Sequence, residues 1–222
     1  MELTIHCIKH MRLAPCKHLV TKRNVVLVAT ATHELLARSS GCSTHAYSDI
    51  DTDVGLDQPG GGDTLCTWRP RYCLDIFLYI SHDPRDAFLG VVMHGANPTV
   101  EYFRCEEQLA LSSALVGGIF YGHLTCDTHA DDSSQFNILI YDGIPADSAG
   151  SIVSVQARYA WIQSLENNLR SMKIADVNLV VQWAGCPAIH PKIAEMPLPH
   201  QKGGIVIMKT NAPYTCYAFD PQ

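Results

Sequence analysis

The sequence predicts an α+β fold of two packed, mainly antiparallel sheets with flanking helices. Two observations support this class: many short strand-like runs follow one another, and one long amphipathic helix interrupts them. The chain has 222 residues, of which 47% are hydrophobic and 17% charged, so it can bury a sizeable core. We therefore expect a single domain over residues 1–222.

The strand-like runs are rich in β-branched and aromatic residues. They lie at 3–8, 24–30, 73–80, 88–94, 100–104, 118–126, 136–141, 177–183 and 204–209. In the run 73–80, Leu74, Ile76, Leu78 and Ile80 alternate with Asp75, Phe77 and Tyr79. One face of this strand is therefore aliphatic, and the other carries an acid and two aromatic rings, as expected for a strand that lines a pocket.

The strongest helix is predicted over residues 154–172. Its apolar residues recur at steps of three and four, which is typical of a helix packed on a sheet: Val155, Tyr159, Ile162, Leu165, Leu169 and Met172. Shorter helices are expected at 33–38 and 106–113. The segment 41–64 is rich in Ser, Asp and Gly and predicts a long exposed loop.

Charge and cysteine content restrict the partners and the compartment. Sixteen basic and 22 acidic residues give a net charge of −6, so a nucleic-acid ligand must be held at a local site. Nine cysteines, an odd number without a C-x-x-C pair, indicate a reducing environment. No apolar run reaches the ~18 residues of a membrane span. We expect an intracellular protein, nuclear or cytoplasmic, without a membrane partner.

Two groups of metal-ligating residue types do not have the spacing of known metal sites. His6, Cys7, His10, Cys16 and His18 carry side chains of the types that bind zinc, and Asp49, Asp51 and Asp53 carry carboxylates of the type that binds calcium. The first group fits no standard zinc finger. The second lacks the glutamate of a calcium loop at its twelfth position. We therefore expect neither a metal nor a cofactor.

Common phosphate-loop, hydrolase and dinucleotide motifs are absent, but an ordered series of weaker motifs runs from residue 65 onward. It consists of the strand and turn 65–72, Phe-Tyr-Gly-His-Leu at 120–124, the strand 136–142 ending in Tyr141-Asp142, R-x-x-W at Arg158 and Trp161, Gly-Gly-Ile-Val-Ile at 203–207, and Pro213-Tyr214. This series resembles the nucleotidyltransferase domain of mRNA guanylyltransferases and ATP-dependent ligases. It resembles more closely the non-catalytic cap-binding domain of snurportin.

The resemblance implies a binding site without catalysis. The lysine of the family's K-x-D-G turn is absent and Arg69 or Arg71 takes its neighbourhood, while His123 and Gly203 stand where the family has acids. A guanidinium stays protonated and cannot act as the nucleophile. The implied catalytic set is therefore empty, and the protein is interpreted as a pseudoenzyme that binds capped RNA or a purine nucleotide.

The candidate ligand-binding residues are Trp161, Arg158, Trp68, Arg69, Arg71 and Asp142. An aromatic ring would stack on the base and the arginines would bind phosphates. Trp161 fits a core position equally well, and Trp183, inside a buried strand, fits the core better than a ligand site. Two alternatives remain: a scaffold that binds a protein partner, and an enzyme that uses a lysine such as Lys202 or Lys209.

Overall fold

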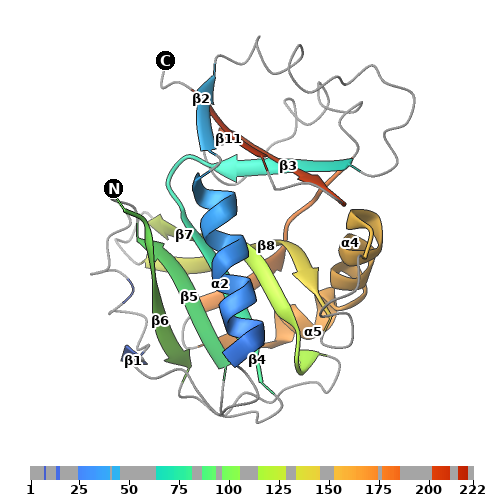
Figure 1. Cartoon of the computed structure of the whole chain (residues 1–222). Coiled ribbons are helices and arrows are strands. Elements are labelled where there is room, and N and C mark those ends of the chain that lie inside the picture. Colours follow the sequence, from blue (N-terminus) through green and yellow to red (C-terminus); the bar gives the residue numbers. More distant parts are fainter. Residues whose placement is uncertain are drawn as a thin grey trace.

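The computed structural model of the chain describes residues 8, 14–15, 25–40, 42–45, 64–81, 87–93, 97–105, 115–128, 134–145, 153–174, 177–185, 202–210 and 215–219. These residues form an α+β fold in which a large sheet lies beneath a small one (Figure 1). All neighbouring strands pair antiparallel except β8 with β10 and β2 with β12. The predicted class of two mainly antiparallel sheets with flanking helices is confirmed at this level.

The large sheet has the strand order β1-β6-β5-β4-β7-β8-β10-β9. Its strands are β1 (Ala14–Pro15), β4 (Leu74–Ile80), β5 (Ala87–Met93), β6 (Thr99–Cys105), β7 (Ile119–Thr128), β8 (Ser134–Ile144), β9 (Lys173–Ile174) and β10 (Val177–Val181). The small sheet has the order β2-β12-β11-β3, with β2 (Cys42–His45), β3 (Thr64–Pro70), β11 (Lys202–Lys209) and β12 (Thr215–Phe219).

The alternation along β4 separates the two faces of the large sheet. Phe77 pairs with Tyr121 of β7, whose hydroxyl donates to Glu34 of helix α2 (Val25–Ser40) at 2.6 Å, so α2 covers the aromatic face. Leu78 pairs with Phe120, whose ring stacks on Trp161 of α4 (Val155–Ser164). The two helices therefore cover opposite faces of the large sheet.

The predicted helix 154–172 is two helices, α4 and α5 (Glu166–Ser171), which meet at Leu165. Ser154 caps α4, because its side-chain oxygen accepts a hydrogen bond from the backbone N–H of Ala157 at 3.2 Å. All six residues of the predicted apolar stripe are buried. The periodicity thus gives the buried face correctly, although the helix is interrupted.

The strand predicted at 24–30 is wrong, because residues 25–30 belong to α2, which also includes the helix predicted at 33–38. Its buried residues Val28, Ala31 and Leu35 recur at steps of three and four, so packing on the sheet overrides the strand propensity of the valines. Within the predicted loop 41–64, residues 42–45 form β2 and Thr64 begins β3.

Several expectations fall outside the described residues: the helix at 106–113, the loop residues 46–63, the two metal groups that were considered, Pro213-Tyr214, and the strand at 3–8 apart from the buried, helical Ile8. In the described part of the chain, no helix is both long and apolar enough to cross a membrane.

One hydrophobic core connects the two sheets. Leu65 of β3 and Val206 and Met208 of β11 belong to the same buried cluster as the residues of β4, β7 and β8. Because Leu65 pairs with Met208, these side chains share one face of the small sheet. That inner face faces the large sheet, and it also carries the polar side chains described below.

Candidate functional site

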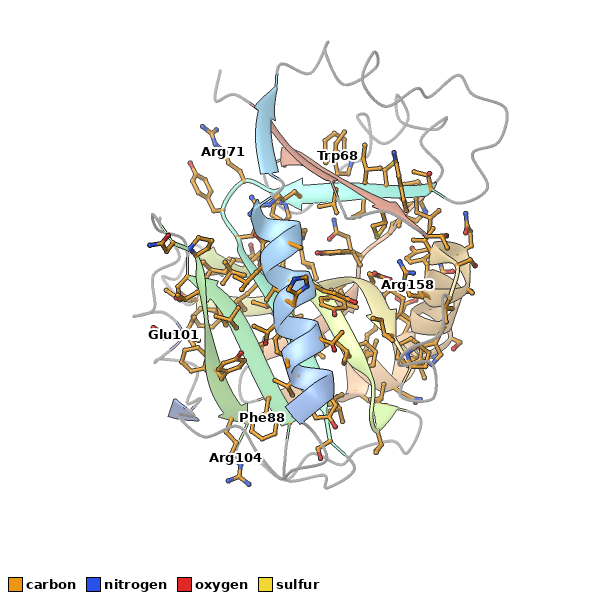
Figure 2. All side chains as sticks on the ribbon, viewed as in Figure 1. Trp68, Arg71, Phe88, Glu101, Arg104 and Arg158 are labelled. Carbon is orange, nitrogen blue, oxygen red and sulfur yellow. The ribbon has the colours of Figure 1, made fainter. Side chains whose placement is uncertain are left out.

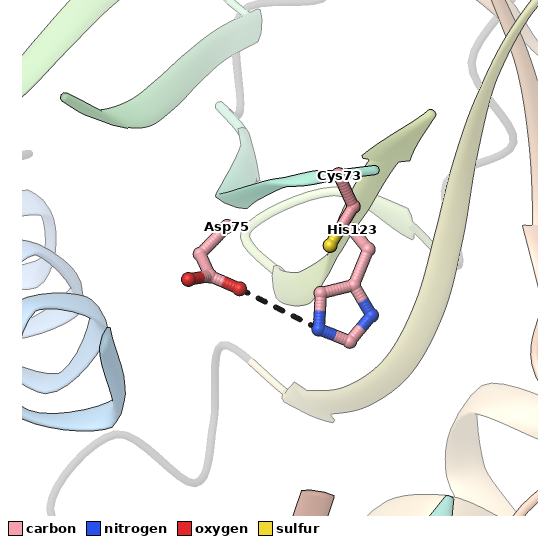
Figure 3. A group of neighbouring side chains, drawn as sticks. All are labelled: Cys73, Asp75 and His123. Carbon is pink, nitrogen blue, oxygen red and sulfur yellow. Dashed lines mark ion pairs between the residues drawn. The ribbon is translucent and has the colours of Figure 1, made fainter. Parts of the chain in front are cut away.

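A buried polar cluster joins the small sheet to the large one. Asp75 of β4 is directly paired with His123 of β7, and their side chains approach to 3.5 Å between Oδ1 and Nε2 (Figure 3). From β3, the Arg69 guanidinium reaches the same carboxylate at 3.2 Å from Oδ2 and 3.4 Å from Oδ1. Asp75 and His123 are both buried. The carboxylate is thus compensated by a cation from the other sheet.

His123 is held in its neutral form by burial. Removal from water lowers its pKa to about 4, and Arg69 acts in the same direction, whereas Asp75 and the nearby Gln182 side chain oppose the change. The Tyr141 ring lies against the imidazole, with 4.8 Å between centroids. At neutral pH the ring therefore has one N–H donor and one acceptor nitrogen.

Two further side chains border this cluster. The Cys73 thiol, just before β4, is half-buried and donates to the carbonyl of Pro70 at 3.2 Å. Gln182, just after β10, donates from its amide nitrogen to the carbonyl of Trp68. His123 Nδ1 and Gln182 Oε1 are buried, and neither has a hydrogen-bond partner among the described residues. The cluster therefore contains two polar atoms whose hydrogen-bonding capacity is not satisfied within this part of the chain.

Asp142 and Arg158, two predicted ligand-binding residues, form a buried ion pair. Arg158 Nε donates to Asp142 Oδ1 at 2.9 Å, and Arg158 Nη1 donates to the Val153 carbonyl at 2.7 Å. The relative exposure is 1% for Asp142 and 8% for Arg158. This geometry anchors α4 to the end of β8 and uses the guanidinium for internal contacts rather than exposing it to a phosphate.

The predicted tryptophans occupy different surroundings. Trp161 is half-buried, and its ring stacks on Phe120 at 5.2 Å between centroids and 13° between planes. Trp68 is only 3% exposed and pairs with Ile205, so it lies on the face of β3 opposite to Arg69. Trp68 is therefore a buried side chain that lies on the other face of β3 from Arg69.

The interpretation of Trp183 as a core residue is wrong, because its side chain is 40% exposed. The strand β10 ends at Val181, two residues before this position, so the predicted strand was too long. The ring of Trp183 packs over Gly185, where a Cβ atom would approach it to 2.2 Å. Trp183 is thus a partly exposed aromatic residue, which the overlong predicted strand placed in the core.

Arg71, in the turn between β3 and β4, is exposed, and its guanidinium carbon lies 5.6 Å from the ring centroid of Tyr72. Tyr72 is 49% exposed. Figure 2 shows Arg71 and Arg158 well separated, on either side of α2. The six predicted ligand-binding residues therefore do not converge: Asp142 pairs with Arg158, Arg69 with Asp75, and Arg71 lies at the surface.

Sequence reasoning missed Asp75, Cys73 and Gln182 as parts of a site, and it treated His123 only as a replaced acid. One signal was available for Asp75, because a carboxylate inside an apolar strand needs a partner. The identity of that partner depends on the register of β4 with β7, which places His123 directly opposite. Gln182 carried no comparable signal.

Comparisons with known proteins assign no family. No family model matches the sequence, and no curated protein matches it. Among solved structures 21 chains match, one of which is named "Pmar-Lig_Pre.", with a TM-score of 0.41 and 8% identity. The alignment covers 80% of this chain and 44% of that one, so this chain spans less than half of its length. This likeness is too weak to support a functional conclusion.

Proposed function

We propose that this chain is a non-catalytic nucleotide-binding or RNA-cap-binding domain, with the ligand's phosphates at the turn between β3 and β4. One observation supports this most strongly. The segments 65–72 and 120–124, which the family resemblance assigns to one nucleotide site, meet at a single carboxylate. Arg69 from the first segment and His123 from the second both contact Asp75.

The turn itself has the chemistry of a phosphate site. Arg69 is held against Asp75 from one face of β3, while Arg71 is exposed beside the exposed ring of Tyr72. A guanidinium binds phosphate through paired hydrogen bonds, and an adjacent aromatic ring can stack on a base. Arg71 and Tyr72 therefore replace Arg158 and Trp68 as the residues that we expect to contact the ligand first.

The proposed site binds without forming a covalent intermediate. Arginine keeps its proton at any physiological pH, so neither Arg69 nor Arg71 can attack a nucleotide phosphate as the family's lysine does. Incubation with α-labelled GTP or ATP and a divalent metal should give no labelled band in denaturing electrophoresis. A band that survives boiling would instead favour the enzymatic alternative.

A ligand panel tests the binding proposal directly. GTP, ATP, cap dinucleotides and short RNAs are compared by thermal unfolding, since a ligand at 100 times its Kd adds about 2.7 kcal/mol to stability. For the ligand that binds, Arg71→Ala should weaken affinity about tenfold, because one charged phosphate contact is worth ~1.5 kcal/mol or more. Arg104→Ala is the matched control, since Arg104 is exposed and lies at the opposite end of the molecule (Figure 2).

The proposal fails if the parent binds no member of the panel, or if Arg71→Ala and Arg104→Ala weaken binding equally. The first result would favour the protein-interaction scaffold, for which Tyr72 and Trp183 are the exposed large hydrophobic residues of the described chain. In that case Trp183→Ser should remove the interaction with a protein partner, while the thermal stability of the chain is retained.

A further inference from the structure

Three potential metal ligands converge at the edge of the buried polar cluster. One ligand atom from each of Cys73, Asp75 and His123 lies within 4.8 Å of the other two, and Figure 3 shows the three side chains directed toward one another. Cys73 lies immediately before β4, Asp75 is the second residue of that strand, and His123 occupies the directly paired position of β7. A thiolate, a carboxylate and an imidazole together are a ligand set that suits zinc.

The hydrogen bonds of His123 provide a second, independent observation. Its Nδ1 and the nearby Gln182 Oε1 are both buried, and neither has a partner among the described residues. A proton on Nδ1 could be donated to Gln182 Oε1, which would satisfy both atoms at once. The outer nitrogen of a metal-bound histidine commonly makes such a hydrogen bond, which fixes the ring for coordination through Nε2.

With the proton on Nδ1, the lone pair of Nε2 faces Asp75 Oδ1 across 3.5 Å. Two acceptors at this distance need a cation between them. Two ligands on a tetrahedral zinc ion, with bonds of about 2.1 Å, are separated by about 3.4 Å. Arg69 contacts the same carboxylate, chiefly through Oδ2, and so orients it as the outer partners of metal ligands commonly do.

We propose that Cys73, Asp75 and His123 bind a zinc ion, with Gln182 and Arg69 orienting the histidine and the carboxylate. The fourth position falls to water or an exogenous ligand, and the half-buried Cys73 side gives access to it. A Cys-His-Asp nucleophilic triad is not supported, because in such a triad the acid contacts one nitrogen of the imidazole and the thiol contacts the other. Here Nδ1 has no described partner, thiol included.

Cobalt(II) is the probe, because its absorption reports both tetrahedral geometry and thiolate coordination. The full chain is stripped with a chelator and titrated with Co²⁺ in the absence of nucleotide. We expect one equivalent with a thiolate-to-metal charge-transfer band, which added Zn²⁺ removes by displacement. Cys73→Ser should abolish that band, and Cys126→Ser, a change at another half-buried thiol, should leave it unchanged.

Asp75→Asn and His123→Gln should each weaken cobalt binding at least tenfold, and circular dichroism verifies that each variant is folded. If either variant fails to fold, Cys73→Ser still decides, since its thiol is half-buried and the change is nearly isosteric. The proposal is overturned if the parent binds no cobalt, or if the charge-transfer band persists in Cys73→Ser. Because no nucleotide is present, these outcomes are independent of the proposed function.

Discussion

Replacing Asp142 by Asn should destabilise the chain severely, because it leaves a buried cation without its counter-charge. The substitution keeps the size of the side chain and removes one charge, while Arg158 stays 8% exposed. The 2.9 Å hydrogen bond from Arg158 Nε to Asp142 Oδ1 then has a neutral acceptor in place of a charged one. Breaking a buried ion pair in this way costs about 3 to 5 kcal/mol, a large share of the ~5 to 15 kcal/mol that stabilises a typical domain.

Urea denaturation followed by circular dichroism measures this loss as a shift of the midpoint at constant m-value. Asp127→Asn is the matched control, since Asp127 is half-buried and accepts a hydrogen bond from the neutral Asn137 Nδ2 at 2.7 Å. That change should cost only about 1 kcal/mol. The double variant Asp142→Leu/Arg158→Met should recover much of the loss, because it removes both charges.

A loss below about 1 kcal/mol for Asp142→Asn would refute the view that Arg158 is committed to internal contacts. It would return Arg158 to the list of phosphate ligands. In that case Arg158→Ala should weaken nucleotide binding while the free energy of unfolding changes little.

Two further predictions concern His123 and Trp161. In the unfolded chain His123 takes up a proton near pH 6.5, whereas in the folded chain its pKa is about 4. Because the unfolded state binds the proton first as the pH falls, the free energy of unfolding should decrease by about 3 kcal/mol between pH 6.5 and a pH below 4. The measurement is made with a chelator present. Denaturation across this pH range should show a smaller fall in His123→Gln, and an equal fall in both would exclude His123 as the cause. Trp161→Ala should cost about 3 kcal/mol in a melting experiment through the lost stacking on Phe120. A folded variant that melts like the parent yet loses nucleotide affinity would instead identify Trp161 as the base platform.

The sequence predicted best where a simple periodicity assigns residues to distinct faces of an element. The two sides of β4 follow from a period of two, and the apolar stripe of residues 154–172 follows from a period of about 3.6. The residues of β4 and of the stripe are buried. Prediction failed for α2, where valines with high strand propensity stand in a helix. Local propensity is a weak term there, because the sheet beneath the helix supplies more burial than the backbone preference opposes.

The candidate site was harder to predict because it depends on pairing between distant segments. Arg69 and His123 were both singled out, but as members of separate motifs. Their common partner Asp75 emerges only from the register of β4 with β7 and the approach of β3 from the other sheet. Asp142 and Arg158 were also singled out as ligand contacts, yet their mutual pairing requires the orientation of α4 on β8.

The small sheet has a consequence for the order in which the chain folds. Its strand β3 pairs with β11 from Thr64↔Lys209 to Lys202↔Pro70, so the two paired strands are far apart in the sequence. Closing so long a loop is entropically costly before any contact compensates for it, whereas β4, β5 and β6 pair with their neighbours in sequence. We expect the large sheet to form first and β3 to dock last. Arg69 would then reach Asp75 in one of the final steps of folding, and until that step the carboxylate would remain accessible to water.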